Sequence, residues 1–176
     1  MDNQTLVPAL IAIGSNINPE LNIPLALKML DTSARIRCVS NFYFSAPLGD
    51  SEQPQFVNGA CLIEMQLSPR KLKFDLLRRI ETELGRVRTN NKYAPRTIDL
   101  DIACYEEETF NESGLLIPDP DIATRPFLAV PLSEIAPNWS VPGLDGTLQE
   151  IAQRVGHEGL TLATELTRQL KERYGR

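Results

Sequence analysis

The chain has 176 residues and a mass of 19.7 kDa, which fits one compact domain over residues 1–176 and argues against two full ones. Its content of 42% apolar and 23% charged residues supports a hydrophobic core and differs from that of a disordered chain. The formal net charge of −5 argues against a general nucleic-acid binder, because affinity for phosphate depends on Lys and Arg.

Neither the apolar stretches nor the cysteines indicate a membrane or secreted protein. Stretches such as Leu6 to Ile13 are far shorter than the roughly 20 residues of a membrane-spanning helix, and no charged segment precedes an apolar one at the N-terminus. The three cysteines, Cys38, Cys61 and Cys104, are odd in number and lack CxxC spacing, which argues against a disulfide framework. These features predict a soluble cytoplasmic protein without a membrane partner.

The pattern of apolar residues predicts four strands and four helices. Short apolar or alternating runs bounded by turn residues are typical of strands, and they cover Leu6–Ile13, Arg35–Phe44, Phe56–Met65 and Ile98–Tyr105. Helices are expected where Asn, Ser or Pro precedes apolar residues at helical spacing: from Asn18 or Asn22, from Ser68 to Gly85, over Pro126–Ile135 and over Thr161–Glu172. The order βαββαβ predicts an α+β fold with a ferredoxin-like core, in which helices pack on an antiparallel sheet.

Charge is distributed unevenly along the chain. Residues 70–96 contain nine basic and three acidic side chains, a local charge of +6, whereas residues 97–124 contain eight acidic side chains and no Lys or Arg. A solvated helix beside an acidic loop is the simplest interpretation of such runs. The motif at the boundary between the two runs favours a functional interpretation instead.

That motif contains two carboxylates, Asp99 and Asp101, on one face of the fourth predicted strand. At a separation of roughly 7 Å their repulsion would be about 2 kcal/mol at an effective dielectric near 20, and a divalent cation would remove it. A small set of oxygen ligands suits Mg²⁺ better than Zn²⁺, and the single histidine, His157, leaves little material for a histidine-based zinc site or a catalytic triad. An Asp-x-Asp pattern also occurs on ordinary solvent-facing strands, so the neighbouring residues decide between the two interpretations.

Three arginines, Arg86, Arg88 and Arg96, lie close in sequence to these carboxylates. A guanidinium group can donate two hydrogen bonds to phosphate oxygens at once. Arginines beside a magnesium site therefore provide the positive charges that a polyphosphate substrate requires. Phosphoryl and pyrophosphoryl transfer depend mainly on positioning and charge stabilisation, which this set can supply. Gly14-Ser15-Asn16 lacks the lysine and most of the glycines of a GxxxxGK[ST] loop, which excludes a P-loop kinase.

The motifs resemble those of the 6-hydroxymethyl-7,8-dihydropterin pyrophosphokinase family over about residues 6–140, which leaves residues 141–176 as a C-terminal helical extension. The resemblance rests on Ile13-Gly14-Ser15-Asn16, Pro47-Leu48-Gly49, Gln53-Pro54-Gln55-Phe56-Val57-Asn58, Gly85-Arg86-Val87-Arg88, Pro95-Arg96-Thr97-Ile98-Asp99-Leu100-Asp101 and Arg125-Pro126-Phe127. It implies a ferredoxin-like fold and a step of folate biosynthesis. In that step the β,γ-pyrophosphoryl group of ATP passes to the pterin hydroxymethyl group with two Mg²⁺ ions, and AMP is released.

The resemblance also implies roles for individual residues. Asp99 and Asp101 would ligate both magnesium ions, and Arg86 and Arg96 would contact the phosphates. Further residues would lie near the nucleotide: Glu81, Arg88, Tyr93, Ile102 and Arg125. Phe56 and Phe127 would sandwich the pterin, Asn58 would bind its edge, and the backbone of Ala46, Pro47 and Leu48 would complete the pocket. A flat polar heteroaromatic compound does require aromatic faces and a few aimed amides, although core packing is the ordinary role of a phenylalanine.

Two positions depart from the family pattern. Asp119 follows Pro118 where the family usually has a phosphate-contacting histidine, and Tyr93 stands where many members carry tryptophan. Asp119 keeps open a second interpretation, a catalytically weakened relative that binds a pterin or nucleotide without efficient transfer. A third, an RNA-binding sheet, ranks last because the fourth strand offers carboxylates rather than aromatic and basic groups. The expected partners are therefore ATP and a reduced pterin, with no nucleic acid, and the chain is expected to be a monomer or a weak homodimer.

Overall fold

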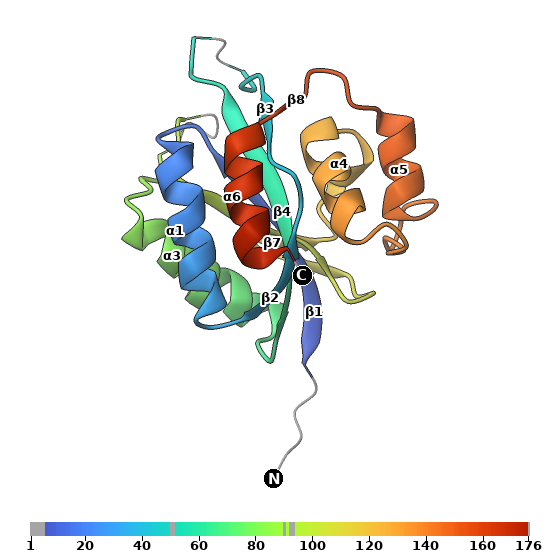
Figure 1. Cartoon of the computed structure of the whole chain (residues 1–176). Helices are drawn as coiled ribbons and strands as arrows, with labels where there is room; N and C mark the ends of the chain where they lie inside the picture. The colour runs from blue at the N-terminus through green and yellow to red at the C-terminus, as the bar shows by residue number, and fades with distance from the viewer. Residues whose placement is uncertain (1–5, 50–51, 90, 92–93, 176) are drawn as a thin grey trace.

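The centre of the molecule is an antiparallel sheet with helices on both faces (Figure 1). The computed structural model describes residues 6–49, 52–89, 91 and 94–175. In the sheet the strand order is β5-β1-β4-β3-β8, and β2 also pairs with β4. The strands are β1 (Val7–Ser15), β2 (Arg35–Val39), β3 (Tyr43–Ser45), β4 (Phe56–Met65), β5 (Asp99–Tyr105) and β8 (Thr161–Leu162). The α+β class and the predicted ferredoxin-like core are confirmed, because the strand that returns after the second helix lies beside β1.

Two hydrophobic clusters hold the helices to the sheet. One face packs against α1 (Pro19–Asp31), the helix formed by α2 (Pro69–Lys71), η1 (Leu72–Leu77) and α3 (Arg78–Glu83), and α6 (Thr164–Tyr174). The other face packs against α4 (Pro126–Ile135), α5 (Leu148–Val155) and the short 3₁₀ helix η2 (Pro120–Ala123). Residues of β1 alternate between the clusters, with Ile11 in the first and Leu10 in the second, so this strand is buried on both faces.

Several elements match the sequence prediction closely. β4 and α4 have the predicted bounds, and α1 begins at Pro19, after Asn18 rather than after Asn22. Proline is favoured at this first helical position because its missing N–H would have no partner there.

Among the described residues, no helix is both long enough and apolar enough to span a bilayer.

The predicted strand Arg35–Phe44 is wrong in one respect, because the structure divides it into β2 and β3. At Ser40 the chain exchanges hydrogen bonds with Ala60, and Phe42 then turns into the core over Gly59. A Cβ at Gly59 would lie 2.5 Å from the Phe42 ring, so this close approach requires glycine. The break therefore depends on contacts between segments that are distant in the sequence.

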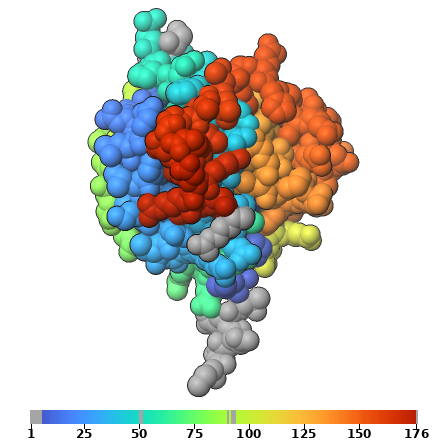
Figure 2. Space-filling view, in the orientation of Figure 1, coloured from blue at the N-terminus to red at the C-terminus, as the bar shows by residue number. Residues whose placement is uncertain are grey.

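The C-terminal region is also corrected. The predicted helix over Thr161–Glu172 begins at Thr164, because Thr161 and Leu162 form β8 and pair with β3. Four further elements were not predicted: β6 (Phe110–Glu112), β7 (Leu115–Ile117), η2 and α5. Figure 2 shows that the C-terminal helix lies directly over the N-terminal part of the chain, and Leu166 and Leu170 belong to the same buried cluster as β1.

The second predicted helix extends as expected, but it contains a π-helical segment, η1, between α2 and α3. Ser68 caps its start, since the Ser68 hydroxyl accepts a bond from the backbone N–H of Lys71. Gly85 follows its end with a φ of +76°. Together with Leu72, Leu76 and Leu77, the π-helical segment buries a charged side chain, that of Lys73. π-Helical turns are rare and occur frequently at functional sites.

Candidate active site

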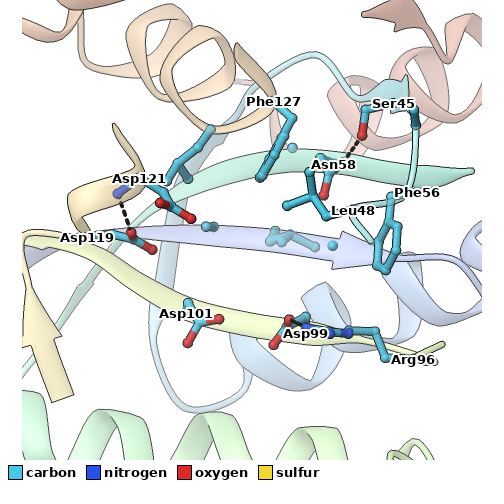
Figure 3. Close-up of a pocket in the computed structure, with 16 residues that line it drawn as sticks. Ser45, Leu48, Phe56, Asn58, Arg96, Asp99, Asp101, Asp119, Asp121 and Phe127 are labelled. Carbon is cyan, nitrogen blue, oxygen red and sulfur yellow. Dashed lines mark hydrogen bonds and ion pairs between the residues drawn. The ribbon is translucent and has the colours of Figure 1, made fainter. Parts of the chain in front are cut away.

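A cavity of about 280 Å³ lies between the sheet and the start of α4 (Figure 3). Its lining residues come from β1, β3, β4, β5, η2, α4, the loop that follows β3 and the residues just before β5 and η2: Ala12, Ile13, Gly14, Ser45, Ala46, Leu48, Phe56, Asn58, Gly59, Arg96, Asp99, Asp101, Asp119, Asp121, Phe127 and Leu128. The cavity thus brings together residues more than 100 positions apart, and it contains most of the predicted site residues.

Asp99 and Asp101 share one face of β5, as the alternation predicts. Leu100 and Ile102 point to the opposite face and are buried in the core. Opposite the two carboxylates on β1 lie the small residues Gly14, paired with Asp99, and Ala12, paired with Asp101. A Cβ at Gly14 would lie 2.9 Å from Oδ1 of Asn58, so a glycine here leaves room for that amide.

The register between β5 and β1 shifts just beyond these acids. Ile102 pairs with Ile11, whereas Cys104 pairs with Leu10, so β5 has one extra residue, Ala103, at this point. Such a bulge re-aims the strand beyond it, and Ala103 and Cys104 accordingly both lie in the second cluster. The alternation that exposes Asp99 and Asp101 to the cavity therefore holds only up to this bulge.

Asp99 lies between two guanidinium groups. Arg86 donates to Oδ1 and Arg96 donates to Oδ2, so both oxygens of this carboxylate are ion-paired. Burial opposes ionisation of Asp99, but the charges of Arg86 and Arg96 hold its pKa below the ordinary value. The Asp99 carboxylate is therefore ionised at neutral pH, and it holds two arginine side chains beside it.

Glu81 lies behind this pair and is buried below the cavity floor. It accepts hydrogen bonds from Arg86, from Arg88 and, at 2.9 Å, from the backbone N–H of Leu100. Burial raises the pKa of Glu81, while the Leu100 N–H and the Arg86 guanidinium act in the opposite direction. Glu81 thereby connects α3 to β5 and holds Arg86 against Asp99.

Asp101 is paired with Lys73, a residue that was not among the predicted ones. The Lys73 ammonium donates to Oδ1 of Asp101 and, at 2.9 Å, to the backbone carbonyl of Leu100. A sequence signal was present: Lys73 precedes Leu76, Leu77 and Ile80 by three, four and seven residues, so it occupies the apolar stripe of its helix. A lysine at such a position is buried only when a partner compensates its charge.

Arg96 is held in place by the residues that follow β1. The backbone N–H of Arg96 donates to the side chain of Asn16 at 2.8 Å, and the Arg96 carbonyl accepts from the backbone of Asn16 and Ile17. The Ser15 hydroxyl donates to the carbonyl of Thr97 at 2.6 Å. Ser15 and Asn16 therefore hold the segment that leads into β5 against the end of β1.

Two phenylalanines line the opposite part of the cavity (Figure 3). Phe56 begins β4, and Phe127 lies in the first turn of α4 after Pro126. Between them Asn58 donates from Nδ2 to the Ser45 hydroxyl at 2.8 Å, which leaves its Oδ1 to accept a bond. The guanidinium of Arg96 lies 5.7 Å from the centre of the Phe56 ring, so the aromatic and charged parts of the cavity meet there.

Asp119 lies at the end of the cavity beyond Asp101. Its carboxylate accepts a hydrogen bond from the backbone N–H of Asp121 at 2.9 Å and caps η2. Burial raises the pKa of Asp119 to about 6, and the negative charges of Asp101 and Asp121 act in the same direction. Asp119, where this chain departs from the family pattern, therefore lines the cavity. It adds a further carboxyl group to those of Asp99, Asp101 and Asp121.

Some predicted residues do not line the cavity. Ile102 is buried in the core, Pro47 is close in sequence but not part of the lining, and Arg88 is half exposed and paired with Glu81. Arg125 is the residue before α4, and its side chain is likewise not part of the lining. Tyr93 lies outside the described residues. Conversely, Ser45 and Asp121 line the cavity although neither was predicted to do so.

The oxygen groups at Asp99 and Asp101 fit a hard cation of the Mg²⁺ type. In the described part of the chain no three residues of the His, Cys, Asp and Glu types cluster as a complete metal-ligand set. Magnesium does not need one, because it is commonly held by one or two carboxylates together with water and substrate phosphates. The carboxylate pair beside two arginines therefore fits a magnesium–polyphosphate complex better than a protein-only metal site.

Comparisons with known proteins agree with this geometry. The model of the family described as 7,8-dihydro-6-hydroxymethylpterin-pyrophosphokinase (HPPK) matches residues 10–137. The 2-amino-4-hydroxy-6-hydroxymethyldihydropteridine pyrophosphokinase of Haemophilus influenzae is 40% identical over 160 residues, which cover 89% of this chain and 99% of that protein. The protein of the same name from Synechocystis is 38% identical over 151 residues, which cover 84% of this chain and 75% of that protein. The chain belongs to the 7,8-dihydro-6-hydroxymethylpterin-pyrophosphokinase family.

The fold also matches solved structures. A crystal structure of a Plasmodium falciparum HPPK-DHPS triple mutant with SDX-DHP superposes with a TM-score of 0.71 at 13% identity, over 87% of this chain. The match spans 45% of the Plasmodium chain, so more than half of that chain lies outside the match. At this identity the likeness shows the fold.

Proposed function

We propose that this protein transfers the β,γ-pyrophosphoryl group of ATP to 6-hydroxymethyl-7,8-dihydropterin, a step of folate biosynthesis that yields the pterin diphosphate and AMP. One observation carries the proposal: a single cavity joins a carboxylate pair flanked by arginines to a pair of phenylalanines. The first half suits a polyphosphate with its cations, and the second suits a flat heteroaromatic ring. Membership of the pyrophosphokinase family supports the same activity.

At the polyphosphate end, Asp99 and Asp101 would hold two Mg²⁺ ions together with phosphate oxygens. When bound, Mg²⁺ neutralises phosphate charge and polarises the phosphorus centre. Arg86 and Arg96, now paired with Asp99, would bind the triphosphate once cations satisfy that carboxylate. Arginines held in this way stabilise the charge of the transferred group without needing to reorganise during the reaction.

At the pterin end, Phe56 and Phe127 would contact the two faces of the ring, and Oδ1 of Asn58 would accept a hydrogen bond from its edge. The hydroxymethyl group would then point toward the acids. Its oxygen forms a bond to the β-phosphorus while the bond from that phosphorus to the α,β-bridging oxygen breaks, AMP leaves, and the hydroxyl proton passes to solvent. Alignment of the two substrates supplies most of the acceleration.

Asp119 favours a second candidate function, a relative that binds a pterin or a nucleotide but transfers slowly. A carboxyl group at the end of the cavity, next to Asp101, adds repulsion toward phosphate. The two candidates differ in how fast they form one product, because the enzyme releases AMP with repeated turnover and the weakened relative releases it slowly or not at all. A mixture of the protein with ATP, Mg²⁺ and the reduced hydroxymethylpterin, analysed for AMP, distinguishes them.

The carboxylate pair provides the direct test. We expect Asp99→Asn and Asp101→Asn each to lower the rate of AMP formation at least 10²-fold, because each change removes a negative charge from the metal site. The melting temperature should fall in both variants, because Arg86 and Arg96, or Lys73, lose a charged partner, so the rates are compared at a temperature at which each variant is folded. Glu112→Gln, an exposed change on β6, is the matched control. A full rate in either aspartate variant would refute the assignment.

We also propose a reducing compartment such as the cytoplasm. The proposal is supported by three cysteines in the free form, two of which, Cys61 and Cys104, are buried in the hydrophobic clusters.

A further inference from the structure

Lys73 carries a charge in a place where the fold otherwise buries apolar groups. Its side chain is 8% exposed and belongs to the π-helical segment, next to Leu72, Leu76 and Leu77. Lysine is almost never buried to this degree unless it is paired. Its cost to the fold must therefore be compensated by the two groups that it contacts, the Asp101 carboxylate and the Leu100 carbonyl.

Lys73 acts from below the cavity floor and not from within the cavity. It does not line the cavity, whereas Asp101 does, and the Asp101 side chain is 47% exposed. A buried ammonium fixed by a backbone carbonyl cannot extend to a bound phosphate without breaking both contacts. Any effect of Lys73 on the reaction must therefore pass through Asp101.

The two acids of the site have different partners. Both oxygens of Asp99 are ion-paired, with Arg86 and Arg96. Within the described residues the ion pair of Asp101 is with Lys73 alone, through Oδ1. In that part of the chain Asp101 therefore keeps its second oxygen without an ion pair, whereas each oxygen of Asp99 already accepts from an arginine.

We propose that Lys73 is a positioning residue, which holds Oδ1 of Asp101 so that the other oxygen is presented to a divalent cation. The inference rests on the proposed function, in which Asp101 binds Mg²⁺. The arginines of the site would turn toward phosphate when ATP binds, but Lys73 stays with Asp101 because it is enclosed by the core. Hydrogen-bonded partners of metal-binding carboxylates typically contribute 10- to 100-fold to metal affinity or activity.

The test measures cation binding separately from catalysis. Mn²⁺ is titrated into the protein in the presence of excess nonhydrolysable ATP analogue and followed by electron paramagnetic resonance. We expect Lys73→Met to weaken Mn²⁺ binding 10- to 100-fold and to raise the Mg²⁺ concentration needed for half-maximal AMP formation by a similar factor. The KM for the pterin should not change. Lys71→Met, an exposed change two residues earlier in the same helical segment, is the matched control.

A double-mutant cycle separates positioning from general structural support. In an Asp101→Asn background, Lys73→Met should add no further loss of Mn²⁺ affinity, because the group through which Lys73 acts is already altered. Lys73→Arg, which keeps the charge and the donor, should recover part of the lost affinity. If Lys73→Met does not fold, Lys73→Gln replaces it in the cycle and in the titration, and the same loss of affinity is expected.

Three outcomes would overturn the inference. Unchanged Mn²⁺ affinity in the folded variant would mean that Lys73 serves stability alone. Tighter Mn²⁺ binding would mean that the ammonium competes with the cation rather than preparing its ligand. Equal losses in the wild-type and Asp101→Asn backgrounds would place the effect elsewhere. Failure of the proposed function is distinguished from these results, because in that case the wild-type protein itself forms no AMP.

Discussion

Asp119 lies in the cavity wall as a carboxyl group whose ionised form is disfavoured by burial and by two neighbouring acids. Its pKa is about 6 in the folded protein, compared with an ordinary value of 3.8. Between these pH values the folded protein holds a proton that the unfolded chain releases, so the stability falls as the pH rises through this window. Above pH 6 the Asp119 carboxyl group is ionised in both the folded and the unfolded protein, and the loss of stability reaches its maximum.

This sign leads to a pH-dependent prediction for a single substitution. Asp119→Asn should raise the melting temperature at pH 8, because the amide carries no charge while its oxygen can still accept from the Asp121 N–H. The gain should shrink between pH 6 and pH 4 and vanish below pH 4. Thermal unfolding without metal or substrate at these pH values measures it, with Asp145→Asn on the exposed loop before α5 as the control. An equal gain at every pH would contradict the assigned cause.

Arg96 belongs to both halves of the cavity, since it pairs with Asp99 and lies over Phe56. Arg96→Ala should lower the rate of AMP formation about 10²- to 10³-fold, by comparison with arginines that stabilise other phosphoryl-transfer reactions. Arg168→Ala on the surface of α6 should leave the rate unchanged. Steady-state assays of AMP release measure both, and a rate above one tenth of the wild type in Arg96→Ala would count against the proposed contact.

Single residues were predictable where one rule determined them. Asp99 and Asp101 alternate with core residues, so their shared face followed from the period of a strand. Lys73 was missed because a lysine on a helix is normally exposed, and its burial depends on an acid that lies 28 positions later. Ile102, which the family resemblance predicted to lie near the nucleotide, has its side chain buried in the core and does not line the cavity.

Elements were predictable where the local pattern was unbroken. β4 and α4 each have a continuous apolar pattern with clear ends, and their predicted bounds are confirmed. The division between β2 and β3 has no such local signal, because it depends on Phe42 packing over Gly59 from another strand. The start of α5 does carry a local signal, the capping box of Thr147 and Glu150, which apolar periodicity alone does not detect.

The break between β2 and β3 is held from outside the sheet by α6. The Thr167 hydroxyl accepts a hydrogen bond from the buried backbone N–H of Phe42 at 2.9 Å. Thr167→Val should destabilise the protein by about 1–3 kcal/mol, because it leaves that N–H without a partner. Thr167→Ser keeps the hydroxyl and should cost less. Urea unfolding of both variants measures the difference, and equal stabilities would show that the bond contributes little.

At the scale of the whole molecule, the order of strands and helices in the first 105 residues was predictable from periodicity, because strands and helices there follow one another with distinct patterns. The second layer of helices, α4 with α5, was predictable only in part. Its position over the sheet depends on contacts with Leu10, Ala60 and Ala103. These are small or buried strand residues, and the sequence around them shows no pattern that marks where a helix will pack. The cavity forms where this layer meets the sheet, so its shape could not be derived from the sequence alone.

The segment beyond the family match contributes to the same core. The family match ends at residue 137, but Leu166, Leu170 and Tyr174 of α6 lie in one buried cluster with β1 and α1. β8 adds to this connection by pairing with β3. We therefore propose that residues 1–176 form one cooperative domain rather than a catalytic unit with an appended tail.

A core substitution in α6 tests this proposal. Leu170→Ala should lower the stability by about 2–5 kcal/mol, the usual cost of a buried leucine-to-alanine change. If the domain is cooperative, unfolding followed by the fluorescence of Trp139 and by far-ultraviolet circular dichroism should give coincident transitions. Lys171→Ala, an exposed neighbour, is the control. If unfolding occurs in two separate transitions and the substitution shifts only the earlier one, the C-terminal segment folds independently of the rest of the chain.

The bulge at Ala103 sets a rule for how this stretch of the protein can vary in length. Before the bulge, loss or gain of a single codon between Thr97 and Asp101 would exchange the two faces of β5. Leu100 would then point toward the substrates, and a carboxylate would point into the hydrophobic core. Changes of two codons would preserve the parity. We therefore expect viable insertions and deletions before the bulge to come in even numbers, whereas the bulge itself shows where one odd residue can be absorbed.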